Sequence, residues 1–221
     1  YCVPSYLTNK PEVVAPGKDI VLNVDLLASM SGSGTSFSAP LVTGVVAQLI
    51  QKTRSYIDRE NYVTYYKAIL MLGAEDNKVN DTSIRTSDPS TFHNKSGAGF
   101  VNAVNSANNG EFQIYCKLNQ MYTSGCVYFP YHTSYTPFKA VLVFEKPENI
   151  YIEEVYGNNF DMVLLRQSNG AELAASRSMI DNFEIFKSAW PGDGTVTLGF
   201  QTRSVIPSDL YISLSIVWRS I

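Results

Sequence analysis

The stretch Ser33-Gly34-Thr35-Ser36-Phe37-Ser38-Ala39-Pro40 joins a loop of small residues to a long apolar segment. From Phe37 to about Thr53, apolar residues recur at the i, i+4 and i+8 positions of one helical face. Pro40 fits the first turn of such a helix, where backbone N–H groups have no intrahelical partner. The pattern therefore predicts a deeply buried helix with Ser36 at its N-terminus. Before it, Ile20 to Leu27 is predicted to be a buried strand and Ser29 to Thr35 a tight loop.

A serine at a helix N-terminus has features that suit acyl transfer. Unpaired N–H groups and the positive end of the helix dipole would stabilise an oxyanion that forms on an attacked carbonyl group. The hydroxyl group is a weak nucleophile at neutral pH, so it needs a positioned base to take its proton. A Thr-Ser pair before an arbitrary helix more often serves only as a cap. The wider sequence has to decide between these two interpretations.

Two further segments lie in order around this stretch. Lys10-Pro11-Glu12-Val13-Val14-Ala15-Pro16-Gly17 precedes it, and Ser96-Gly97-Ala98-Gly99-Phe100-Val101-Asn102-Ala103 follows it. Together the three segments resemble motifs of the subtilisin-like serine proteases (subtilases). The resemblance covers residues 1–110 and implies the C-terminal portion of a subtilisin-like catalytic domain, an α/β fold of three layers with a mostly parallel sheet. Between the motifs, Tyr62 to Gly73 is predicted to be a second helix.

The resemblance implies roles for residues in and around the nucleophile segment. Ser36 would attack peptide bonds and form an acyl-enzyme, and its backbone N–H would be one oxyanion donor. Gly34 and Phe37 would contact the substrate, Phe37 on the leaving-group side. Glu12 stands where the family more often has Asp, a change on a structural loop that should leave the chemistry unaltered.

The rest of the catalytic triad has no counterpart in this sequence. In the subtilisin-like family Asp and His precede the serine, in Asp-Thr/Ser-Gly and His-Gly-Thr segments, and neither segment occurs here. The two histidines, His93 and His132, both follow Ser36, and we interpret them as loop imidazoles rather than as the base. The resemblance therefore implies that an upstream segment or chain supplies Asp and His. This chain alone is then expected to be inactive.

Two alternatives remain open at this point. Sedolisin-like serine-carboxyl proteases carry a similar nucleophile segment and use a glutamate base. They usually follow it with a calcium site of Asp-Ile and Gly-rich turns, which this sequence lacks. A non-catalytic subtilisin-like homologue that acts as a protein-binding module would keep the fold and the serine without the triad.

Helical periodicity ends after the polar turn Ala107-Asn108-Asn109-Gly110, which predicts a second domain over residues 111–221. Its short apolar runs, separated by turn residues, predict an all-β sandwich or jelly roll. Residues 160–176 loosely resemble the β-sandwich domains appended to secreted bacterial proteases. The predicted strands are Phe112 to Leu118, Cys126 to Phe129, Phe138 to Phe144, Phe160 to Arg166, Glu172 to Ser176, Asn182 to Phe186, Thr195 to Gln201 and Leu210 to Trp218.

Composition narrows the range of partners. A net charge of -3 and a pI of about 5.4, without a Lys/Arg run, argue against nucleic acid and anionic membranes as partners. No apolar run approaches the length of a membrane-spanning helix. A polypeptide substrate and secretion to the outside of the cell follow only from the resemblance.

No cofactor is predicted, because no Cys or His cluster has the spacing of metal ligands. Several carboxylates could supply oxygens to a structural calcium ion, but their irregular spacing favours a solvated face. They are Glu145, Glu148, Glu153, Glu154, Asp161 and Asp193.

Three cysteines leave one unpaired in any single-bridge arrangement. Cys116 and Cys126 bracket a turn-like segment with apolar and aromatic flanks, which fits a disulfide across a hairpin. Two half-buried thiols fit equally well, because disulfide connectivity cannot be deduced from sequence alone. Cys2 would then remain to pair elsewhere.

Overall fold

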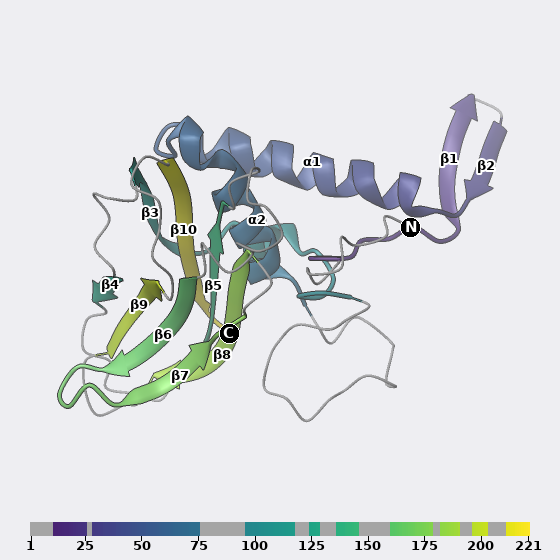
Figure 1. The fold of residues 1–221 in the computed structure, drawn as a ribbon. Helices are drawn as coiled ribbons and strands as arrows, with labels where there is room; N and C mark the ends of the chain where they lie inside the picture. The colour runs from purple at the N-terminus through teal and green to yellow at the C-terminus, as the bar shows by residue number, and fades with distance from the viewer. Residues whose placement is uncertain are drawn as a thin grey trace, which may run out of the picture.

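The computed structural model describes residues 11–25, 28–75, 96–117, 124–128, 136–145, 160–178, 182–190, 196–202 and 211–221. Within these ranges the N-terminal half is largely helical and the C-terminal half is built of strands (Figure 1). The N-terminal elements are β1 (Ile20–Asp25), β2 (Ala28–Gly32), α1 (Thr35–Thr53), the 3-10 helix η1 (Arg59–Asn61), α2 (Tyr62–Gly73) and α3 (Ala103–Ser106). The C-terminal strands are β3 (Gly110–Lys117), β4 (Ser124–Tyr128), β5 (Thr136–Phe144), β6 (Phe160–Arg166), β7 (Glu172–Ser176), β8 (Phe183–Trp190), β9 (Val196–Thr202) and β10 (Tyr211–Ser220).

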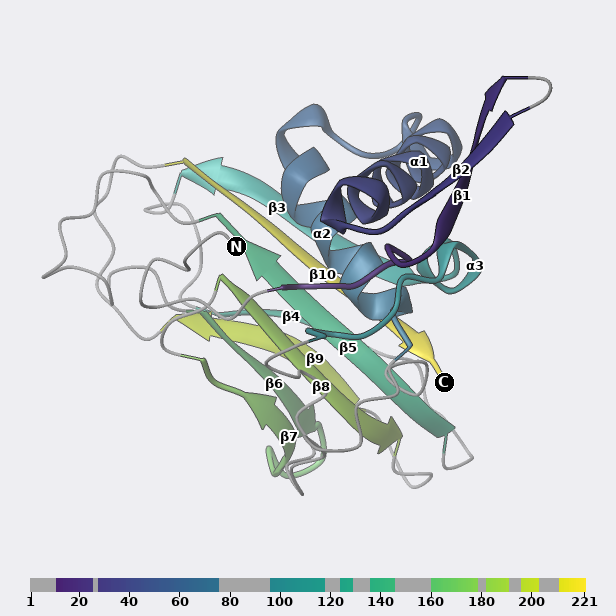
Figure 2. The same ribbon diagram turned by 90° about the vertical axis from the view of Figure 1, so that its right-hand side faces the viewer.

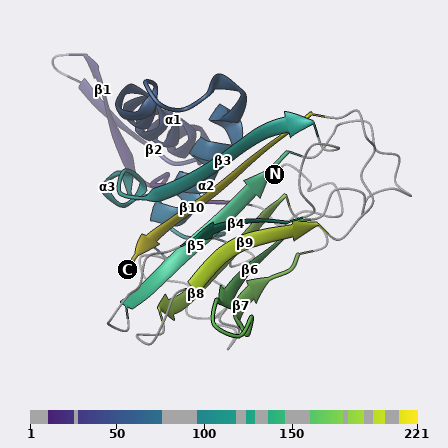
Figure 3. The ribbon, with the colours of Figure 1, turned by 90° about the vertical axis from the view of Figure 1, so that its left-hand side faces the viewer.

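The C-terminal strands form two four-stranded sheets in which every described pairing is antiparallel. The first sheet, in the order β3-β10-β5-β8, will be called the inner sheet, and the second has the order β4-β9-β6-β7. Figure 3 shows the two sheets from the side of β3 and β9. All eight predicted strands are present, and β6 and β7 have the predicted bounds. Alternating apolar patterns were therefore sufficient to locate these strands.

An apolar cluster lies between the two sheets. It combines Phe138 and Leu142 of β5 with Phe160 of β6 and Phe200 of β9. Phe160 packs edge-to-face against both Phe144 and Phe200, an arrangement that aromatic rings favour. The inner sheet therefore buries side chains of β5, β8 and β10 against its neighbour.

The opposite face of the inner sheet is covered by α2. Side chains alternate between the faces of a strand, so Val141 and Val143 of β5 point away from the neighbouring sheet. They join Val217 of β10 and the helix residues Tyr65 and Ile69 in a second apolar cluster. Figure 2 shows the helices on the side of the inner sheet that is remote from β6, β7 and β9. The helical half and the strand half thus share one hydrophobic core.

Buried polar contacts also cross between α2 and the inner sheet. The ammonium group of Lys139, 3% exposed, donates to the carbonyl oxygens of Met71 at 2.7 Å and Ala74 at 3.1 Å. These carbonyls lie at the C-terminal end of α2, where a cation is favoured by the helix dipole and no intrahelical donor is available. The Thr64 hydroxyl lies 2.7 Å from the Ser213 hydroxyl and 3.0 Å from that of Ser215. These bonds satisfy groups that would otherwise be costly to bury.

The segment before α1 differs from the sequence prediction. Residues 29–32 were expected to be part of a loop, but they belong to β2, which pairs with β1 in an antiparallel hairpin. The predicted buried strand is exposed where it is described, with Val21 67% and Leu22 41% accessible. The hairpin projects from the N-terminal end of α1 (Figure 1), and no described residues cover it there.

The prediction that α1 is deeply buried was also wrong for this structure. Only Leu49 and Thr53, both near its C-terminal end, are buried, and Leu41 is 45% exposed. The C-terminal turns contact α2, whereas the N-terminal turns extend beyond the described part of the sheets (Figure 1). The apolar face of α1 is therefore only partly covered: Val42, Val45, Val46 and Ile50 pack against the second cluster but stay partly exposed.

The expected mostly parallel, three-layer sheet is not formed by the described residues of the N-terminal half. They contribute the antiparallel β1–β2 hairpin and one parallel bridge, Val14 to Phe100. Parallel pairing needs a long crossover, and here α1 and α2 lie between the two bridged segments. The α/β layer is thus represented by a single bridge.

The predicted hairpin around Cys116 and Cys126 was wrong as well. Cys116 lies in β3, which pairs with β10, whereas Cys126 lies in β4, which pairs with β9 in the other sheet. Consecutive strands of facing sheets often change sheet instead of pairing with each other. The side chains of both cysteines, and Cys2 itself, lie outside the described part of the structure, so the disulfide stays a prediction.

None of the helices in the described ranges is long and apolar enough to cross a membrane.

Candidate active site

The three sequence motifs lie together in space. Residues 11–17, which we call the support segment, run beside residues 96–101. The Ala98 N–H donates to the Glu12 carbonyl at 2.8 Å, and the Val101 N–H donates to the Val14 carbonyl at 2.9 Å. The Val14 N–H donates in turn to the Gly99 carbonyl at 2.9 Å. Two motifs that are more than eighty positions apart in sequence are therefore joined by a ladder of backbone hydrogen bonds.

The same support segment holds both flanks of Ser36. The Gly34 N–H donates to the Gly17 carbonyl at 2.7 Å. On the other side, the Ser38 hydroxyl donates to the Ala15 carbonyl at 3.2 Å. The N-terminus of α1 is thus fixed by two hydrogen bonds that bracket Ser36.

Ser36 itself is exposed in the first turn of α1. Gly34 is the N-cap residue and offers no side-chain acceptor to the free N–H groups of this turn. Within the described residues, Ser36 is not engaged as a cap, because Ser38 and Ser33 make the hydroxyl contacts here. The local arrangement leaves a hydroxyl group and a helix N-terminus open to a ligand.

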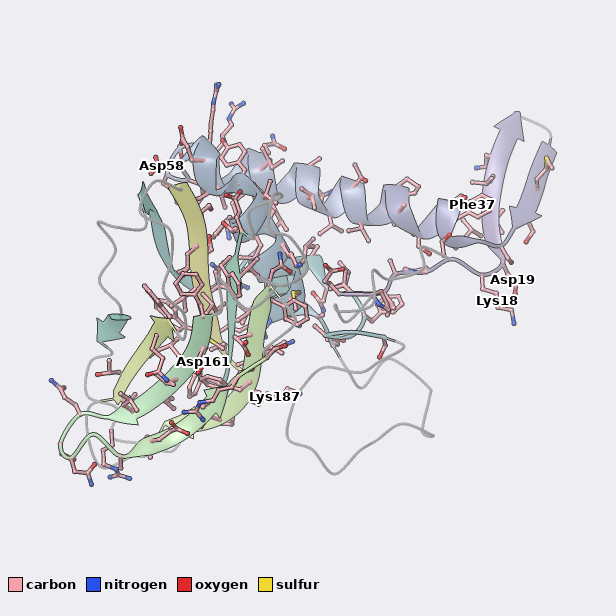
Figure 4. All side chains as sticks on the ribbon, viewed as in Figure 1. Lys18, Asp19, Phe37, Asp58, Asp161 and Lys187 are labelled. Carbon is pink, nitrogen blue, oxygen red and sulfur yellow. The ribbon has the colours of Figure 1, made fainter. Side chains whose placement is uncertain are left out.

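Phe37 lies beside the base of the β1–β2 hairpin, at the opposite end of α1 from Asp58 (Figure 4). A Cβ atom added to Gly32, the last residue of β2, would lie only 2.5 Å from the Phe37 ring. The ring therefore packs directly over the Gly32 backbone and fixes the hairpin to the helix. This contact gives Phe37 a structural reason to be aromatic, in addition to any contact with a substrate.

Glycines allow the close approach of the support segment. A Cβ atom at Gly17 would lie 2.3 Å from the Ser38 Oγ, and one at Gly97 would lie 2.2 Å from the Pro11 carbonyl oxygen. Gly97 also has φ of 61°, a left-handed conformation that glycine adopts most readily. Both positions therefore need glycine, and both lie within the motifs that the sequence singled out.

The end of the third motif is fixed by Glu75. Its Oε1 accepts hydrogen bonds from the side chains of Asn102 at 2.7 Å and Asn105 at 3.0 Å. Asn102 in turn caps α3, because its Oδ1 accepts from the Asn105 N–H at 3.0 Å. Burial lowers the pKa of the Arg219 guanidinium from its ordinary value, while the charge of Glu75 partly opposes this. Glu75 is a structural residue that the motif resemblance did not indicate.

Lys67 of α2 connects the support segment to the inner sheet. Its ammonium nitrogen lies 2.8 Å from a carboxylate oxygen of Glu12 and donates to the Asn182 Oδ1 at 2.8 Å. It also lies 5.2 Å from the centre of the Phe183 ring. Glu12, a departure from the family pattern, thus has a specific partner. No sequence pattern indicated this partner, because Glu12 and Lys67 are 55 positions apart along the chain.

No base for Ser36 is found among the described residues. Neither histidine can be placed, since His93 and His132 lie outside the described ranges. In those ranges no group of three or more His, Cys, Asp or Glu side chains could hold a metal ion. Of the carboxylates considered for calcium, Asp161 is buried and its Oδ2 lies 3.5 Å from the Arg177 Nε. Hydrogen bonding to Glu172 raises the pKa of Arg177, which remains a cation beside Asp161.

Comparison with known proteins agrees with the motif geometry. The family model described as "Subtilase family" matches residues 1–110. This half of the chain is subtilase-like. The match contains all three motifs that the backbone hydrogen bonds connect, and it supports a protease of the subtilase type at the family level. The subtilase-like half ends where β3 begins, at Gly110.

Outside the subtilase-like half, the comparisons add little. No curated protein matches the chain. A solved structure, the crystal structure of the Yersinia pseudotuberculosis-derived mitogen, is 13% identical and matches 50% of this chain and 84% of its own, with a TM-score of 0.32. A similarity of this size carries no conclusion about fold or function.

Proposed function

We propose that this chain is the C-terminal part of a subtilisin-like serine endopeptidase, with Ser36 as the nucleophile. The observation that carries the proposal is that the support segment joins the third motif to the N-terminus of α1, where Ser36 is exposed between two anchoring hydrogen bonds. If Ser36 were only a helix cap, its hydroxyl oxygen would be expected to accept a hydrogen bond from a nearby backbone N–H. The family match over residues 1–110 supports the same role.

In the proposed reaction, the Ser36 Oγ attacks the carbonyl carbon of a peptide bond. A histidine from an upstream segment or chain takes the hydroxyl proton, and an aspartate there orients that histidine. The backbone N–H of Ser36, at the positive end of α1, donates to the oxyanion. The C–N bond then breaks, the amine leaves with the proton, and water hydrolyses the acyl-enzyme. Gly34 and Phe37 would line the substrate site on either side of Ser36.

The exposed apolar surface of the N-terminal half supports the requirement for an upstream partner. Leu41 of α1 and Val21, Leu22 and Met30 of the hairpin are between 41% and 67% exposed. The hairpin and the N-terminal turns of α1 lie at the end of the molecule that carries Ser36 (Figure 1). Several exposed large apolar side chains on neighbouring elements beside a candidate site favour an interface there. We propose that the upstream segment covers α1 and completes the α/β layer of a catalytic domain.

The proposed organisation has two parts. Residues 1–110 form the C-terminal portion of the catalytic domain, and residues 111–221 form an appended β-sandwich. Extracellular localisation is proposed by analogy with the subtilases. No cofactor is needed for this chemistry, because the nucleophile and the proposed triad partners are side chains.

The test is to combine the chain with its upstream segment and treat the complex with a fluorophosphonate probe. Labelling at Ser36 and its loss in Ser36→Ala are expected, because the probe reacts only with an activated serine. Thr43→Val is the matched control, since it removes an exposed hydroxyl of the same helix, bonded only to the Ala39 carbonyl, without removing the nucleophile or its anchors. A folded complex that is not labelled would favour the non-catalytic binding module. Labelling of the isolated chain would show that the base lies within these residues and would overturn the split-triad proposal.

A further inference from the structure

We infer that Lys67 is a positioning residue through which the inner sheet fixes the nucleophile segment. The inference rests on the proposed function of Ser36 and extends it to a residue of α2. Lys67 does not belong to any of the three motifs. It is the side chain that joins the support segment to the start of β8.

The geometry forms a continuous path of short contacts. The Lys67 ammonium group is held by Asn182 and the Phe183 ring on one side and by Glu12 on the other. From Glu12 the support segment runs to Ala15 and Gly17, whose carbonyl groups hold the two flanks of Ser36. The backbone between Glu12 and Gly17 is only five peptide bonds long. A displacement of Glu12 is therefore transmitted over a short, hydrogen-bonded stretch.

The Lys67 contacts are suited to fixing a position. The side chains of Lys67 and Glu12 are 19% and 23% exposed, so their ion pair is screened less than one on the open surface. Three partners from two segments, Glu12 on one side and the neighbouring Asn182 and Phe183 on the other, restrict the ammonium group. Because the end of the Lys67 side chain is held by Asn182, it keeps Glu12, and with it the support segment, at a fixed position relative to the inner sheet.

Small displacements matter at a nucleophile. A shift of about 1 Å in a reacting group can reduce a rate about a hundredfold, even when its cause lies far from the chemistry. Release of Glu12 would loosen the carbonyl groups that anchor Gly34 and Ser38. Lys67 touches neither Ser36 nor the motif residues on either side of Ser36. A change at Lys67 would therefore alter the geometry of the site and not proton transfer.

The experiment compares Lys67→Met with wild type in the complex of the chain and its upstream segment. The methionine keeps an apolar stem beside Phe183 and removes the cation. At saturating fluorophosphonate, the rate of Ser36 labelling is expected to fall between about tenfold and a hundredfold. Glu12→Gln is expected to give a similar loss, and the double variant no further loss, because both changes break one ion pair. Lys67→Arg, which keeps the cation, is expected to restore most of the rate.

Thr64→Val is the matched control for a loss of stability. It breaks the hydroxyl contacts between α2 and β10 but lies off the path to the support segment. A merely structural role for Lys67 would make the two variants equal in labelling once they are matched in thermal stability. A positioning role predicts loss of labelling in Lys67→Met alone.

Hydrogen exchange in the isolated chain gives a second readout. The Gly34 amide, which donates to Gly17, is expected to exchange faster in Lys67→Met than in wild type and Thr64→Val. Unchanged Gly34 exchange together with an unchanged labelling rate would overturn the inference. An unlabelled wild-type complex would instead refute the proposed function, so the two failures are distinguishable. The exchange experiment tests the path without requiring catalysis.

Discussion

The N–H group of Gly34 donates to the carbonyl oxygen of Gly17 at 2.7 Å, immediately before the helix that carries Ser36. The two glycines belong to different motifs, and the hydrogen bond joins them at the point where a Cβ atom on Gly17 would not fit. The position of the nucleophile segment therefore depends on a glycine that lies nineteen positions before Ser36.

Gly17→Ala is expected to reduce Ser36 labelling in the complex by about tenfold or more, because the added Cβ would lie 2.3 Å from Ser38 and 2.9 Å from the Gly34 carbonyl oxygen. The start of α1 must then move. Labelling kinetics with the fluorophosphonate probe measure the effect. Labelling at the wild-type rate would show that the close approach of the two segments does not control the site.

Gly44→Ala changes a glycine within α1 and, unlike Gly17→Ala, is expected to stabilise the chain. A Cβ atom at Gly44 meets nothing within 4 Å, and alanine favours a helix over glycine by about 1 kcal/mol. Thermal or denaturant unfolding should therefore show a more stable isolated chain. If the upstream segment packs closely on α1, as proposed, the same variant should bind that segment more weakly. Equal binding would place the interface on another face.

Gly97→Ala is expected to destabilise the chain by more than the conformational cost of alanine. Gly97 and Gly170 have similar left-handed φ values, 61° and 67°. At Gly170 an added Cβ meets nothing within 4 Å, whereas at Gly97 it would lie 2.2 Å from the Pro11 carbonyl oxygen. Gly170→Ala should cost about 1 kcal/mol, and Gly97→Ala clearly more. If urea unfolding shows that both variants lose the same free energy of unfolding, the support segment can move away from the added Cβ without a measurable cost.

Lys139→Met is expected to lower the free energy of unfolding by about 2–4 kcal/mol. The change removes the buried donor to the Met71 and Ala74 carbonyl groups and the cation at the end of α2. Lys18→Met, at an exposed position, is the control and should leave stability within about 0.5 kcal/mol of wild type. If both variants unfold alike, the Lys139 contacts contribute nothing to the joining of helix and sheet.

The sequence predicted the local elements well where a periodic pattern is also buried. The helix Tyr62–Gly73 has the predicted bounds, as do β6 and β7. In these elements the apolar pattern and the tertiary environment agree, so local reasoning is sufficient. The placement of Ser36 in the first turn of α1 was also correct, because the small residues before it end the preceding strand.

The errors arose where the environment could not be known from the chain. The apolar pattern of β1 and α1 predicted burial, but burial depends on what lies opposite, and the described residues leave Val21 of β1 and Leu41 of α1 exposed. Strand pairing is equally non-local, which explains why β3 and β4 were wrongly joined as a hairpin. The contacts of Lys67 with Asn182, of Lys139 with Met71 and of Thr64 with Ser213 link positions that are 68 or more residues apart, and no motif records them.

The covering of the inner sheet on both faces has a consequence for biosynthesis. The helix α2 precedes the strands of the inner sheet in sequence, yet its apolar side is buried against β5 and against β10, the last of the described strands. Until residues 211–221 have left the ribosome, this side of the helix has an incomplete binding surface, and contacts of such long sequence separation form slowly. Folding of the half that carries Ser36 would therefore wait until β10 has been synthesised. A chain that terminates before β10 would leave α2 without part of its packing surface, and α1 with a less stable partner.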